Sequence, residues 1–159
     1  MNTAIRSHAA GPGADLPIET IKHGSQTLAI ILRRSFTREG IEFLTPSNFS
    51  QQLGYMRRPR GYTIAPHVHK PVRREVHYTK EVLFIRSGRL RADFYDDNRT
   101  YLTSTLLEQG DVILLAYGGH GFEMLEECEM IEVKQGPYAG DEDKERFEPV
   151  ARDSISFDR

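Results

Sequence analysis

Residues 81–107 read EVLFIRSGRLRADFYDDNRTYLTSTLL, and this stretch decides the fold class. It contains parts of three runs, 76–85, 90–95 and 101–107, in which apolar and β-branched residues are continuous or alternate with polar ones. Glycine, aspartate and asparagine separate the runs, as expected between β-strands. The Asp96–Asn98 cluster predicts a hairpin turn between two of them.

Similar short runs occur on both sides of this stretch, so the pattern extends over most of the chain. They cover residues 28–32, 61–69, 112–115, 122–125 and 130–134. None of the chain shows the i, i+3, i+4, i+7 apolar stripe of an amphipathic helix, so we expect little helix. The sequence predicts an all-β sandwich or small barrel.

Composition narrows the class of protein. At 159 residues, with 38% hydrophobic residues and a net charge of −2, the chain fits one ordinary domain. The apolar runs are too short to span a bilayer, no secretory signal is visible, and the single cysteine suits a reducing compartment. We therefore expect a cytoplasmic protein. The slightly acidic balance and the absence of a stacking motif argue against nucleic acid as a partner.

Two histidines suggest a metal site. His67 and His69 are two residues apart in a strand-like run, so their side chains should share one face. Two imidazoles on one face can bind one metal ion, and a carboxylate with a further imidazole would complete four ligands.

The spacing of these residues resembles two motifs of the cupin superfamily, and the motifs cover a little over a third of the chain. The first is Gly61-x5-His67-x-His69-x11-Glu81-x6-Gly88, and the second is Gly110-x9-His120, with Gly118 in the position of the family's glycine. The first motif has eleven residues before its glutamate where the family has three or four. Glu75 or His77 could therefore take the place of Glu81.

The resemblance implies a double-stranded β-helix, the jelly-roll cupin barrel, over residues 18–138. A flexible arm (1–17) would precede it and an extension (139–159) would follow it. It also implies a divalent metal ion (Fe, Mn, Zn or Ni) bound by His67, His69, Glu81 and His120. Cupins commonly pair, so we expect a homodimer.

A late strand carries the candidate catalytic residues. Ile131 and Val133 alternate with Glu132 and Lys134, and by default the apolar pair should face the core. If Glu132 and Lys134 face inward instead, they become candidates for acid–base catalysis.

Charge is unevenly distributed along the sequence. Residues 57–91 hold ten basic and two acidic residues, whereas residues 123–159 hold twelve acidic and five basic ones. A basic rim would attract an anionic small molecule. Cupins include metal-dependent sugar and sugar-phosphate isomerases and epimerases, so the resemblance, together with this basic rim, implies a metal-dependent isomerase or epimerase acting on a sugar-like or anionic metabolite. The alternatives are an Fe- or Mn-dependent dioxygenase and a non-catalytic metabolite-binding protein.

Overall fold

The computed structural model describes residues 16–157, and it contains ten β-strands and two single-turn 3₁₀ helices. The strands are β1 (Ile18–His23), β2 (Gln26–Leu32), β3 (Gly40–Phe43), β4 (Gly54–Arg57), β5 (Glu81–Ser87), β6 (Arg89–Tyr95), β7 (Tyr101–Glu108), β8 (Val112–Leu115), β9 (Gly119–Met124) and β10 (Glu129–Lys134). The helices are η1 (Gly140–Glu142) and η2 (Arg152–Ser154). The expectation of an all-β protein is confirmed. Most of the expected N-terminal arm, residues 1–15, lies outside the described residues.

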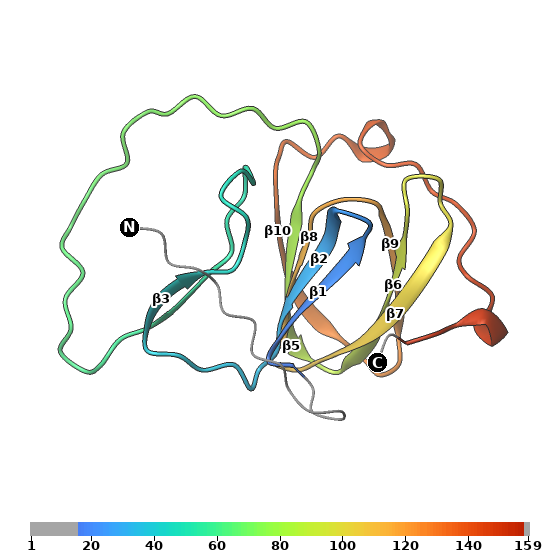
Figure 1. Cartoon of the computed structure of the whole chain (residues 1–159), viewed down its shortest axis with the longest axis horizontal. Coiled ribbons are helices and arrows are strands. Elements are labelled where there is room, and N and C mark those ends of the chain that lie inside the picture. Colours follow the sequence, from blue (N-terminus) through green and yellow to red (C-terminus); the bar gives the residue numbers. More distant parts are fainter. Residues whose placement is uncertain (1–15, 158–159) are drawn as a thin grey trace.

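The strands form three antiparallel sheets (Figure 1). The large sheet has the order β1-β2-β8-β5-β10, the second has the order β7-β6-β9, and β3 and β4 form a separate hairpin. No sheet in the described part of the chain closes on itself into a barrel. β10 is therefore the last strand at one edge of the large sheet, and β9 is the last strand of the second sheet.

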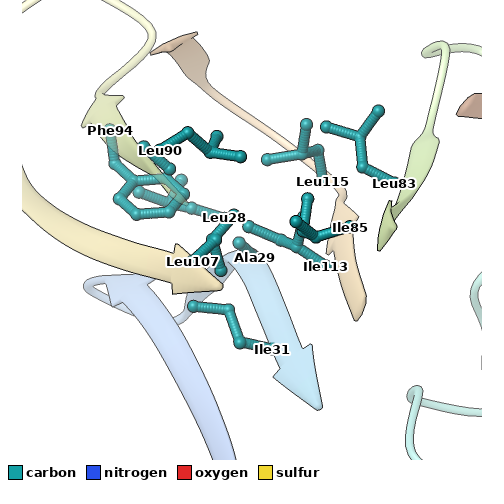
Figure 2. Packing of buried hydrophobic residues seen from close by; sticks show 11 residues of the cluster. Leu28, Ala29, Ile31, Leu83, Ile85, Leu90, Phe94, Leu107, Ile113 and Leu115 are labelled. Atoms are coloured by element: carbon teal, nitrogen blue, oxygen red, sulfur yellow. The ribbon is translucent and has the colours of Figure 1, made fainter. Parts of the chain in front are cut away.

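The main hydrophobic core lies between the large sheet and the second sheet (Figure 2). Leu28, Ile113 and Leu83 come from the large sheet, whereas Leu90 and Phe94 come from β6 in the second sheet. Each of these side chains is at least nine-tenths buried. Burial of a leucine or phenylalanine side chain contributes about 2 kcal/mol, so this packing holds the two sheets against each other.

The β3–β4 hairpin and the loop within it cover part of the outer face of the large sheet. Leu53 packs there on Val82 and Leu114, and Leu44 and Phe49 extend the contact. Because this smaller cluster covers the outer face, β5 and β8 have buried residues on both faces of the sheet.

The C-terminal extension packs on the outer face of the second sheet. The Val150 amide donates a hydrogen bond to the Tyr95 hydroxyl at 3.0 Å, and the Phe147 ring lies edge-on to Tyr95 at 5.0 Å. Further along, the Ser156 amide donates to the Tyr101 hydroxyl at 2.9 Å. These contacts hold residues 147–156 against β6 and β7 of their own chain.

The segment between β4 and β5, residues 58–80, forms no strand. The strand expected over residues 61–69 is therefore absent, and the run expected to start at residue 76 begins at Glu81. Prolines at positions 59, 66 and 71 remove backbone donors, and basic residues repel one another along the segment. An alternating sequence pattern is not enough to form a strand, and no strand of residues 16–157 pairs with this segment.

Within residues 16–157, no helix has the length and apolar character needed to cross a membrane.

Candidate functional site

A wide cavity of about 1470 Å³ extends over one end of the sandwich and onto the outer face of β6, where Arg91, Asp93 and Tyr95 line it. Residues of β5, β9 and β10 line it together with the segment that follows η1. Glu81, His120, Glu132 and Lys144 are among the lining side chains. The cavity therefore gathers several of the residues that the sequence singled out.

The inward direction of Glu81 follows from the alternation of β5. Glu81 shares a face with Leu83 and Ile85, and both of these lie in the main core. Glu81 is the first residue of the strand, so its carboxylate lies where the core ends and the cavity begins. Its side chain is 9% exposed.

His120 reaches the same point from the second sheet. It pairs with Phe94 in the β6–β9 ladder, and Phe122 pairs with Ala92, so His120 and Phe122 share the inward face. Gly118, just before β9, has φ +70°, and a Cβ there would lie 2.4 Å from the Tyr95 carbonyl oxygen. Only glycine fits this close approach, which sets the position at which β9 begins.

The central contact of the site joins His120 to Glu81. His120 Nε2 lies 3.2 Å from Glu81 Oε2. The hydrogen bond from His120, helped by the positive charges nearby, lowers the pKa of Glu81 to about 2. Burial opposes ionisation of Glu81, but its effect is smaller than that of these groups together. Glu81 is thus a carboxylate at neutral pH and can only accept, so His120 Nε2 carries the proton that is donated.

Two lysines lie against the other oxygen of Glu81. The Nζ atoms of Lys134 and Lys144 are 3.5 and 3.4 Å from Glu81 Oε1. Lys134 also lies 3.0 Å from Glu132 Oε1, and this carboxylate raises the pKa of Lys134. Lys134 therefore acts as an ammonium group rather than as a base.

The inward pair on β10 is the charged one. Lys134 pairs with Glu81 and Glu132 pairs with Leu83, which places both charged residues on the inner face. Ile131 and Val133 are 49% and 50% exposed on the outer face, so the default expectation that they face the core is wrong. The physical reason is that the ion pairs around Glu81 satisfy the charged groups at the cavity, whereas the outer face of β10 is left uncovered.

Lys144 was not singled out by the sequence. It lies in an exposed, charged stretch after η1, where a lysine usually faces solvent. The Thr79 hydroxyl donates a hydrogen bond to Asp143 Oδ1 at 2.7 Å and ties this stretch to the start of β5. That long-range contact brings Lys144 to Glu81, and no local sequence pattern predicts this position of Lys144.

His67 and His69 lie elsewhere in this structure. Both are exposed in the 58–80 segment, with their rings 5.2 Å apart. Glu75 and His77, the alternatives to Glu81 as a ligand, also lie in this segment and are 3.7 Å from each other. Of these two, His77 lines the cavity. The structure brings Glu81 and His120 together, and it does not bring the His67–His69 pair to them.

The implied metal site can be tested against this arrangement. Glu81 and His120 supply two donors, and the described residues contain no group of three or more His, Cys, Asp or Glu side chains placed to hold a metal ion. Two ammonium groups also lie against the Glu81 carboxylate, and their charge opposes a cation there. In this arrangement the residues do not fit a metal ion, and the acid–base groups available are the side chains themselves. The four-ligand site stays a prediction.

Comparison with known proteins adds no assignment. No protein-family description, curated protein or solved structure matches the chain.

Proposed function

We propose that the protein is an isomerase or epimerase that moves a proton next to a carbonyl group in a sugar-like or anionic metabolite. The contact between His120 and the ionised Glu81, inside a cavity that also exposes Lys144, carries this proposal. A carboxylate that fixes an imidazole beside a cationic group is suited to general acid–base catalysis.

His120 is the proposed catalytic base. With its Nε2 hydrogen directed at Glu81, His120 acts as a base through the lone pair of Nδ1. Nδ1 removes the proton from the carbon next to the carbonyl, and the electron pair of that C–H bond forms an enediolate. In an isomerisation, the hydroxyl proton of the enediolate moves to the former carbonyl oxygen, and His120 returns its proton to the former carbonyl carbon. In an epimerisation, a water molecule protonates the opposite face of the same carbon, and His120 releases its proton to the resulting hydroxide. Glu81 acts as a positioning residue that stabilises the imidazolium between the two steps.

Lys144 is the proposed electrostatic group for the enediolate oxygen. Its side chain is 39% exposed and lines the cavity, so its ammonium can reach a substrate. Lys134 is less exposed and lies between Glu81 and Glu132, which suits a positioning role. Glu132 lines the cavity and could bind a substrate hydroxyl group.

We infer a cupin-type jelly-roll, supported by the two packed antiparallel sheets, the cavity at one end and the two resembling motifs. In a metal-dependent form of the enzyme, the ligands would be His67, His69, Glu81 and His120. For these four to meet, residues 67–69 would have to lie at the cavity rather than in the exposed 58–80 segment.

Solvent isotope exchange tests the proposed reaction. The protein is incubated in D₂O with a panel of aldoses, ketoses, sugar phosphates and nucleotide-linked sugars, and deuterium at the carbon next to the carbonyl is followed by NMR. We expect enzyme-dependent incorporation into at least one compound. Oxygen uptake with a panel compound and no incorporation would favour the dioxygenase instead, and binding without either reaction would favour the metabolite-binding protein.

A further inference from the structure

The 58–80 segment exposes apolar side chains at alternating positions. Tyr62, Ile64, Val68 and Val72 are all more than half exposed, and Val68 reaches 89%. Figure 1 shows the segment as a wide green loop on the side of β3, away from β6, β7 and β9. The one backbone–backbone hydrogen bond recorded within this segment of the described chain joins the Tyr62 amide to the Pro59 carbonyl. An extended segment with free backbone groups and alternating apolar side chains is suited to strand addition.

A matching surface lies at the edge of the large sheet. Among residues 16–157, β10 pairs with β5 alone, so its other side is an open strand edge in this part of the chain. Phe84, Ile131 and Val133 are each at least 40% exposed on the outer face beside this edge. We call the open edge of β10 together with these three side chains the β10 face. An exposed apolar strand edge of this kind is a site for pairing with another chain.

We propose that the 58–80 segment of one copy adds as a strand to the β10 face of a second copy. Two copies can exchange the segment reciprocally, which covers both segments and both faces in one two-fold assembly. An extended chain spans about 3.3 Å per residue, so about eleven residues out and eleven back reach about 36 Å from the body. That reach is enough to cross to a neighbouring copy.

Side-chain alternation fits this placement. In an extended segment Ile64 and Val68 lie on one side, whereas His67 and His69 lie on the other. If Ile64 and Val68 pack beside Ile131 and Val133 on the outer face, both histidines point to the inner face. The partner copy would then contribute two imidazoles to the cavity that holds Glu132 and Glu81. Prolines within the segment are compatible with an added edge strand.

Charge favours a second copy as the occupant. The segment carries basic residues at positions 58, 60, 70, 73, 74 and 80 and one acidic residue, Glu75. The turn before β10 and its first residue carry exposed acidic residues, namely Glu126, Glu127 and Glu129. Glu126 and Glu129 lie 3.5 Å from Arg89 and Arg86 of the same chain, and exposed ion pairs of this kind contribute little and can be exchanged for another partner. The chain thus presents both halves of a complementary pair, and opposite charges would orient the docking. This inference does not depend on the proposed reaction.

Cross-linking between differently tagged copies tests the exchange. In a Cys128→Ser background, one copy carries Ile64→Cys and the other Val133→Cys, and the mixture is treated with a short bismaleimide. We expect a covalent species containing both tags, at twice the 18.2 kDa chain mass. A matched pair with Met124→Cys on β9 in place of Val133→Cys should give at least about tenfold less product.

Two further measurements decide between the outcomes. A chain carrying both Ile64→Cys and Val133→Cys that links only to itself at monomer mass would show that the segment folds back on its own sheet, which overturns the proposal. Sedimentation should show a dimer of the unmodified protein, weakened at least about tenfold by Ile131→Lys with Val133→Lys. A monomer, or a dimer unaffected by these lysines and giving no mixed product, would also overturn it.

Discussion

Replacing Glu81 by glutamine should remove a pH-dependent part of the stability. In the folded protein the His120 contact holds the pKa of Glu81 at about 2, compared with an ordinary value of 4.5. Each pKa unit corresponds to 1.36 kcal/mol, so the shift corresponds to about 3 kcal/mol before solvent screening, and about 2 kcal/mol is expected after it. Because the folded-state pKa is lowered, this stabilisation is complete above pH 4.5 and is lost as the pH falls towards 2.

Urea unfolding at several pH values measures this effect. We expect Glu81→Gln to lower the free energy of unfolding by about 2 kcal/mol at pH 6, with a difference that shrinks below pH 4.5, falls to about a quarter at pH 2.5 and vanishes only below pH 2. Glu75→Gln is the matched control, because Glu75 is exposed and its ion pairs should contribute little. A Glu81→Gln difference that stays constant from pH 6 to pH 2.5 would refute the ion pair as its source.

Two other predictions concern the glycine before β9 and the metal. Gly118→Ala should destabilise the protein by at least about 2 kcal/mol, because its positive φ and the approach to the Tyr95 carbonyl both exclude a Cβ. Thermal unfolding measures this, and an unchanged midpoint would contradict the close approach. Protein purified without chelators should hold about one equivalent of a divalent metal if the four-ligand prediction is right. His67→Ala and His120→Ala should each lose that metal, whereas a wild type that takes up none on reconstitution would exclude the four-ligand site.

Local pattern was sufficient for the strands that pair with sequence neighbours or lie in the core. β2, β6, β7 and β8 lie within one or two residues of the expected runs, because each combines β-branched or alternating residues with a clear turn. The hairpin predicted at Asp96–Asn98 is also present, with the Asp96 amide donating to the Thr100 carbonyl at 3.0 Å.

Features that depend on distant contacts were less predictable. The sequence predicts that the apolar residues of β10 face the core, but the ion pairs of Lys134 with Glu81 and Glu132 hold the charged residues on the inner face. Lys144 reaches the cavity through a contact between Thr79 and Asp143, which are far apart in the sequence. Residues 61–69 alternate like a strand, yet alternation cannot say whether a pairing partner is present.

Deuterium exchange by matched histidine variants measures whether His120 transfers the proton. With a panel compound that exchanges, His120→Gln should lower the rate at least about 100-fold at neutral pH. His23→Gln, on β1 and outside the cavity lining, should leave the rate unchanged. Exchange by His120→Gln at the wild-type rate, with both variants folded, would show that His120 does not transfer the proton.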